Sequence, residues 1–289
     1  MESILKPLAE IYPQLYLTPG TEGAEEAYAR IVRRGEDAPA HSLAPFRGSA
    51  LDEITTEKTP AGEVQVITLG DRQDFELFLQ IMAHRCTPAE IPATQGASIL
   101  DGVVNWPRIH AHREAWLAGG GNPLGWVDEF RRFTSEPRNY KDALIILSVG
   151  PYSAVRAEAA GMAEDEWIAA SHRIRKAHEC THFICRRMFP DRINAIWDEL
   201  AADAVGLYAA FGRYDIRLAE RFLGVTPDGY AGGRLENYAG GEDLDALAQK
   251  IHRTLLHLDQ VIRGEGKTDP YALAIRLENE ISVWTEGGA

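Results

Sequence analysis

The chain has 289 residues, of which 45% are hydrophobic and 25% are charged, and these proportions are ordinary for a globular protein with a sizeable core. Its net charge of −13 argues against a protein that grips nucleic acid or an anionic membrane over a broad face, because such partners attract an excess of Lys and Arg. No apolar run in the sequence approaches the roughly 18 residues of a membrane span.

The first ten residues, MESILKPLAE, lack the basic and then apolar pattern of a secretion signal. The three cysteines form no CxxC pair, so we expect a reducing environment, a cytoplasmic location and no disulfide framework.

The first half of the sequence predicts helices mixed with a few strands. Helical spacing of apolar residues, or a proline start and glycine stop, predicts helices over 23–34, 74–85 (with Asp74 as N-cap) and 107–118. Alternating or short apolar β-branched runs predict strands over 63–69 and 142–149. The glycine-punctuated stretch 91–106 is compatible with a short strand or a helix start.

The second half predicts helices alone. They are expected over 163–188, 191–211, 214–224, 243–263 and 269–284, with a glycine- and proline-rich loop over 225–243. The expected fold class is therefore α+β and helix-rich, with a small mixed sheet in the front half and a helical back half. We expect one compact catalytic domain of two lobes: residues 1–140 as a mixed N-terminal lobe, and residues 141–289 as a mainly helical, metal-binding lobe.

The stretch KAHECTHFICRR, residues 176–187, carries two histidines four residues apart with a glutamate after the first. On a helix, His178 and His182 share one face and present two imidazoles to a common point. Zinc binds such nitrogens in a tetrahedral shell. Glu179 follows directly, where a general base for a metal-bound water would stand.

A third protein ligand is needed, and the segment WDELAAD, residues 197–203, offers one. Glu199 and Asp203 share a helix face whose neighbouring positions are apolar, and buried carboxylates need cations or a metal. We expect Glu199 to bind the metal and Asp203 to accept the second N–H of a ligand histidine. The histidine that we expect Asp203 to contact is His178. The alternative is a solvated acidic stripe on a surface helix.

Together, HECTH and DELAAD resemble the gluzincin branch of zinc metallopeptidases, which have a thermolysin-like architecture. The resemblance covers about 30 residues, and the 16 residues between His182 and Glu199 are fewer than is usual there. It implies a thermolysin-like catalytic core, one zinc ion per chain bound by His178, His182 and Glu199, Glu179 as the residue that activates water, and Asp203 as the residue that orients a histidine.

Two further features would complete a peptidase. The loop GGRLENYAGG, residues 232–241, offers Tyr238 as an oxyanion donor and Arg234 as an anchor for substrate or for structure; a plain surface loop is the alternative. By resemblance, residues 145–149 would form an edge strand that pairs with an extended peptide. Their unbroken apolar run fits a buried central strand equally well.

The sequence therefore predicts a zinc metallopeptidase that acts on a peptide or protein substrate, with neither nucleic acid nor a membrane as partner. One alternative is a non-haem iron(II) oxygenase, because two histidines and one carboxylate also form the triad that binds Fe(II). Another is a protein that uses the metal only for structure or regulation. The sequence leaves the substrate and the oligomeric state open.

Overall fold

The computed structural model describes residues 4–192 and 195–286, with side chains up to residue 280. The chain divides into two compact units, and each is described by itself. The first comprises Met1–Thr55, Gln65–Pro92 and Ile99–Ser148, and the second comprises Thr56–Val64, Ala93–Ser98 and Val149–Ala289. The fold is α+β with a small sheet, as the sequence predicts.

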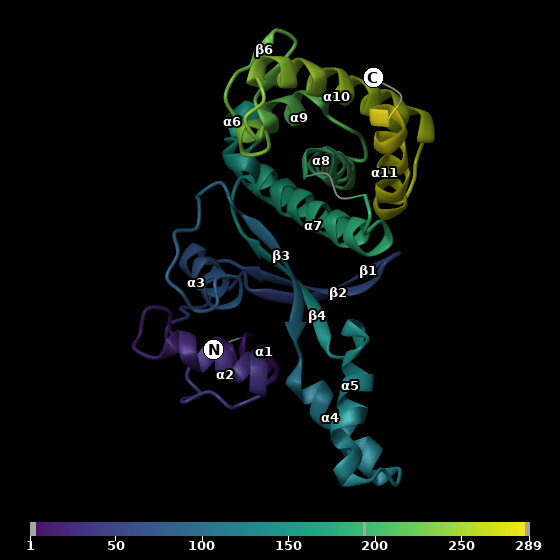
Figure 1. The fold of residues 1–289 in the computed structure, drawn as a ribbon. Coiled ribbons are helices and arrows are strands. Elements are labelled where there is room, and N and C mark those ends of the chain that lie inside the picture. The colour runs from purple at the N-terminus through teal and green to yellow at the C-terminus, as the bar shows by residue number, and fades with distance from the viewer. Residues whose placement is uncertain (1–3, 193–194, 287–289) are drawn as a thin grey trace. The chain divides into compact units, whose positions relative to one another are not determined.

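A four-stranded sheet in the order β1-β2-β4-β3 lies mainly in the first unit (Figure 1), while its residues 56–59, 62–64 and 97–98 belong to the second. Its strands are β1 (Glu53–Thr59), β2 (Gly62–Leu69), β3 (Ala97–Val104) and β4 (Lys141–Ser148). Strand β2 runs parallel to β4, with Gln65 opposite Leu144 and Leu69 opposite Ser148. The expectation that residues 145–149 form an edge strand is wrong: β4 lies between β2 and β3, and its apolar side chains are buried. A buried run of this kind is what a parallel strand covered on both faces requires.

Helices and short 3₁₀ turns complete the first unit: α1 (Lys6–Ile11), η1 (Pro13–Tyr16), α2 (Ala24–Arg34), α3 (Arg72–Met82), α4 (Trp106–Ala118), η2 (Pro123–Gly125), α5 (Trp126–Thr134) and η3 (Pro137–Asn139). The core of this unit packs α1, α2 and α3 against apolar side chains of β2 and β4. The N-cap of α3 is Asp71, which accepts the N–H groups of Gln73 and Asp74. The prediction of Asp74 as N-cap is therefore wrong. Asp74 lies inside the helix, buried, and accepts the N–H groups of Arg47 and Gly48.

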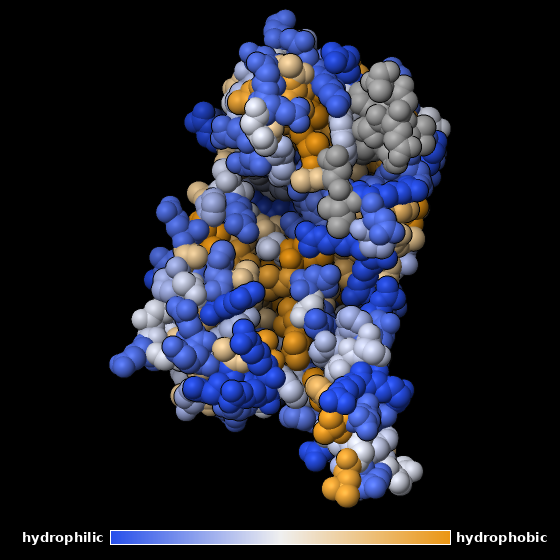
Figure 2. Space-filling view, viewed as in Figure 1, coloured by the Kyte–Doolittle hydropathy of each residue, from blue (hydrophilic) through white to orange (hydrophobic). Residues whose placement is uncertain are grey.

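Helices α4 and α5 form an arm held together by aromatic side chains. Trp126 lies against Trp116 and Phe130, with ring centroids 5.9 Å apart in each pair. His112 stacks on Phe133 at 3.9 Å. No residue of α5 is fully buried, and Figure 2 shows hydrophobic side chains on the surface at the end of this arm.

The second unit is mainly helical. After η4 (Tyr152–Ala154) and α6 (Ala157–Ala160) come α7 (Glu164–Met188), α8 (Ala195–Phe211), α9 (Ile216–Leu223), the short hairpin β5–β6 (Val225–Thr226 and Gly229–Tyr230), η5 (Arg234–Asn237), α10 (Leu244–Glu265) and α11 (Pro270–Glu286). These helices agree with the predicted ones to within a few residues. Part of the predicted start of the second helix falls on residues 193–194, outside the described residues.

Helix α8 lies at the centre of this unit, with α7, α10 and α11 around it (Figure 1). Every residue from Leu200 to Tyr208 is buried, because a helix that is apolar on all sides must be covered on all sides. Gly206 lets α7 come close: a Cβ atom at this position would lie 2.9 Å from the backbone oxygen of Ile174. Among the helices that the structure describes, none is both long and apolar enough to cross a membrane.

Candidate metal centre

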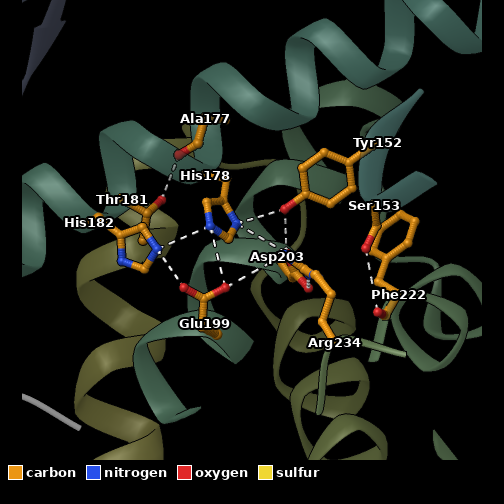
Figure 3. A network of polar contacts seen from close by, with 10 residues as sticks. All are labelled: Tyr152, Ser153, Ala177, His178, Thr181, His182, Glu199, Asp203, Phe222 and Arg234. Carbon is orange, nitrogen blue, oxygen red and sulfur yellow. Dashed lines mark hydrogen bonds and ion pairs between the residues drawn. The ribbon is translucent and has the colours of Figure 1, made fainter. Parts of the chain in front are cut away.

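The two histidines of α7 point together toward α8. His178 and His182 lie one turn apart, and their Nε2 atoms are 3.0 Å from each other (Figure 3). The side chain of His178 is 6% exposed and that of His182 is 12% exposed. The helix thus holds two imidazole nitrogens at one point, largely shielded from water.

Glu199 approaches the same point from α8. Its Oε1 lies 3.1 Å from Nε2 of His182, and its Oε2 lies 3.6 Å from Nε2 of His178. Potential ligand atoms of His178, His182 and Glu199 all lie within 4.8 Å of one another. The close approach of α7 and α8 at Gly206 is what brings a carboxylate of the second helix to the histidines of the first.

These spacings suit a tetrahedral zinc ion. Ligand atoms about 2.05 Å from a metal, at tetrahedral angles, are separated by about 3.3 Å. The two Nε2 atoms are 3.0 Å apart, and Glu199 places one oxygen 3.1 Å from His182 and its other oxygen 3.6 Å from His178, all close to that value. Two imidazoles and one carboxylate are also a donor set that zinc prefers. The residues present therefore fit a zinc ion.

Behind the histidines lies Asp203, one turn along α8 from Glu199. Its Oδ1 is 3.0 Å from Nδ1 of His178, and its side chain is 2% exposed. Arg234, from η5, pairs with Oδ2 of Asp203 and lies 3.6 Å from Oε2 of Glu199. Its guanidinium also lies over the ring of Tyr152, 5.3 Å from the centroid. One cation thus bridges both buried carboxylates.

The electrostatics of this cluster keep both carboxylates ionised. Burial by itself raises the pKa of Glu199, but His178 and His182 outweigh burial and lower that pKa to about 2. Burial likewise opposes ionisation of Asp203, yet Arg234 and His178 hold its pKa well below the usual range. Burial lowers the pKa of His178, and Glu199 and Asp203 more than compensate, so that this pKa is raised. Both carboxylates are therefore available to a cation in their ionised form.

Glu179 follows His178 directly in the chain, and only 8% of its surface is exposed. Among the residues that the structure describes, its carboxylate makes no hydrogen bond or ion pair, although its charge contributes to the raised pKa of His178. A carboxylate in this state can accept a proton from a nearby water.

Tyr238 also reaches the cluster. Burial, followed by the negative charge of the Glu199 carboxylate, raises the pKa of Tyr238. The structure thus brings together every residue that the sequence singles out: His178, Glu179, His182, Glu199, Asp203, Arg234 and Tyr238. Arg234 contacts protein carboxylates, so its observed partners are structural ones.

One residue of the cluster is missing from the sequence reasoning. The hydroxyl of Tyr152 lies 2.6 Å from Oδ1 of Asp203 and 2.9 Å from Nδ1 of His178. Burial raises its pKa well above the usual value, and Asp203 adds to this effect. Tyr152 is 26 residues from His178 and 51 from Asp203 in the chain, so no helical spacing connects it to them. The sequence feature that could have drawn attention to Tyr152 is the Gly150-Pro151 turn directly before it, which directs the chain out of a buried strand.

The comparisons with known proteins identify a family but no activity. No curated protein and no solved structure matches the chain. A family model matches residues 4–261, a range that includes every residue of the cluster. The chain belongs to the family described as "Family of unknown function (DUF7005)".

Proposed function

We propose that the chain is a zinc-dependent metallopeptidase, in which His178, His182 and Glu199 bind one zinc ion and Glu179 is the general base. The observation that carries the proposal is the convergence of His178, His182 and Glu199, whose potential ligand atoms lie within 4.8 Å of one another, next to the buried carboxylate of Glu179. A thermolysin-like arrangement of the two ligand helices, as the sequence motifs suggest, is part of this proposal.

Bound zinc would supply a Lewis acid that polarises a peptide carbonyl and acidifies a water molecule. The carboxylate of Glu179 accepts a proton from the attacking water, and then returns it to the leaving amine as the carbon–nitrogen bond breaks. The water oxygen ends on the new carboxyl group, so the atoms balance as a hydrolysis. Asp203 holds His178 in place by its Nδ1 contact, and the hydroxyl of Tyr238, near Glu199, would donate a hydrogen bond to the developing oxyanion.

The first test is elemental analysis of the purified chain together with hydrolysis of a mixed peptide library. Zinc at one ion per chain and release of new peptide ends support the proposal. Iron with dioxygen-dependent turnover instead supports an oxygenase that uses the same His, His and Glu set, and rejects a peptidase.

The second test is the Glu179→Gln variant. We expect it to keep zinc and to lose hydrolysis by at least about 100-fold, the usual contribution of a general base. Glu166→Gln is the matched control, because Glu166 lies on the same helix and is exposed. Hydrolysis that persists in Glu179→Gln at the level of this control rejects Glu179 as the base.

A further inference from the structure

We propose that Tyr152 is a positioning residue for His178: its hydroxyl, together with Asp203, fixes the proton of the imidazole on Nδ1 and turns Nε2 toward the candidate metal position. The inference deepens the proposed metal site and rests on it. It assigns a role to a tyrosine outside both sequence motifs, on the side of His178 away from Glu199.

The Tyr152 hydroxyl, Asp203 and His178 share too few hydrogens for more than one arrangement of their contacts. An ionised Asp203 can only accept, and a tyrosine hydroxyl has one hydrogen to donate. The shorter contact, 2.6 Å, joins the hydroxyl to Oδ1 of Asp203, so the hydrogen is donated there. At the other contact, 2.9 Å from Nδ1 of His178, the hydroxyl then offers only a lone pair. Nδ1 faces two acceptors and must carry the proton.

The proton on Nδ1 decides which nitrogen of His178 can bind a metal. A neutral imidazole protonated on Nδ1 has its lone pair on Nε2. Nε2 of His178 is the atom that lies 3.0 Å from His182 and 3.6 Å from Glu199. The tyrosine therefore favours the tautomer that can bind a metal, and it does so without touching the metal position (Figure 3).

The chain holds Tyr152 at the start of an unusual turn. Ser153 and Ala154, which follow it, both have positive φ, of 53° and 57°. Non-glycine residues rarely adopt this conformation, and such residues persist where surrounding contacts over-determine them. A strained turn directly after the tyrosine is a sign that its placement matters.

The contacts that hold this turn come from the face of α7 that also carries the histidines. Trp167 Nε1 donates to the carbonyl of Val155 at 2.7 Å, and Ser171 Oγ accepts the N–H of Tyr152 at 2.9 Å. Arg175 donates to the carbonyls of Gly150 and Pro151, at 2.7 and 2.6 Å. One helix face thus positions both the metal-binding histidine and the tyrosine that orients it.

The test compares Tyr152→Phe with Tyr214→Phe in the full chain. Tyr214 is a matched control, because its hydroxyl is buried in the same unit and has no hydrogen-bond partner in the described structure. The first readout is the Nδ1 proton of His178 in the ¹H–¹⁵N spectrum of metal-free, ¹⁵N-histidine-labelled protein. We expect this proton to be protected from solvent exchange in the wild type and in Tyr214→Phe, and to exchange rapidly in Tyr152→Phe.

The second readout is zinc affinity, measured by competition with a chelator. We expect Tyr152→Phe to bind zinc about 10-fold more weakly, the lower end of the usual effect of groups that orient metal-bound histidines, and Tyr214→Phe to bind as the wild type does. An unchanged Nδ1 signal in Tyr152→Phe overturns the inference whatever zinc does. A lost signal with unchanged zinc affinity overturns the link to the metal.

The proton readout needs neither zinc nor peptidase activity, so failure of the proposed function is seen separately, as a wild-type chain that binds no zinc or cleaves no peptide. If circular dichroism shows that Tyr152→Phe does not fold, Ser171→Ala takes its place. This variant removes only the bond to the N–H of Tyr152, and we expect a smaller change in the same direction. If Ser171→Ala changes neither the Nδ1 proton signal nor the zinc affinity, the inference is contradicted.

Discussion

Replacing Arg234 by Met tests whether one buried cation compensates two carboxylates. Methionine keeps most of the aliphatic volume and removes the charge. In the variant, Asp203, whose side chain is 2% exposed, keeps its negative charge but loses its main cationic partner. Glu199, whose side chain is 15% exposed, also loses a cation, the Arg234 guanidinium 3.6 Å away. Breaking a buried ion pair by removing one partner costs about 3–5 kcal/mol, because the remaining charge is buried and uncompensated. We expect a loss of this size in the free energy of unfolding at neutral pH.

The assay is urea unfolding of chelator-treated protein, so that no metal replaces the lost cation. Arg263→Met is the matched control: Arg263 pairs with Asp259 across one helical turn, but its side chain is 76% exposed. Such surface pairs contribute about 0–1 kcal/mol. A loss in Arg234→Met within about 1 kcal/mol of that control would refute the reasoning about buried charge.

The same comparison has a pH dependence with a definite sign. The pKa of Asp203 is depressed in the folded chain, so its ionised form contributes stability above the unfolded pKa, about 3.9, and that contribution is lost as the pH falls. The difference between wild type and Arg234→Met should therefore shrink as the pH falls below about 4. A difference that is constant down to pH 2 would indicate that lost packing, rather than lost charge, is the cause.

Three further results are expected. Gly206→Ala should destabilise the fold by about 1–3 kcal/mol and weaken zinc binding, because the added Cβ lies 2.9 Å from the backbone oxygen of Ile174. The control is Gly264→Ala on α10, where the added Cβ meets no atom within 4 Å, and it should be neutral or stabilising by up to about 1 kcal/mol. Equal changes in the stability of the two variants would contradict the packing argument. Acid unfolding of the metal-free chain should take up protons between about pH 4.5 and pH 2, because the pKa of Glu199 is lowered from 4.5 to about 2; replacing Glu199 by Gln should reduce that uptake. Removing zinc with a chelator should lower the melting temperature of the wild type by an amount that grows with the starting zinc concentration, and no shift at any concentration would speak against a folded-state metal site.

Much of this fold follows from local patterns. Helices α7, α8 and α10 and strands β2 and β4 have long apolar faces or runs, and the sequence predicts each of them. Strand β1 and helix α5 are among the elements that escaped prediction, as are α1, α6 and the hairpin β5–β6. Strand β1 reads EITTEKT and has no buried residue, so its apolar signal is weak. Helix α5 does carry an apolar signal, because Trp126, Phe130 and Phe133 recur at helical spacing.

The candidate site divides in the same way. His178, His182, Glu199 and Asp203 could be chosen from the sequence, because pairs four residues apart on a helix must share a face. The proximity of the two helices could not be read from spacing, since it depends on Gly206 and on tertiary packing. Contacts that join distant segments, such as Arg234 with Asp203, 31 residues apart, are invisible to any local pattern.

The last helix bears on where the folding unit ends. The family model stops at residue 261, inside α10 and before α11. Yet Leu273, Ala274 and Leu277 of α11 belong to the hydrophobic core of the second unit, where α11 packs against α7 and α8. The edge of the family match is therefore a boundary in sequence comparison rather than in folding. A chain cut at residue 261 would expose apolar surface on α7 and α8, the two helices that carry the candidate ligands. A relative that ends at this point needs another segment or partner to bury that surface.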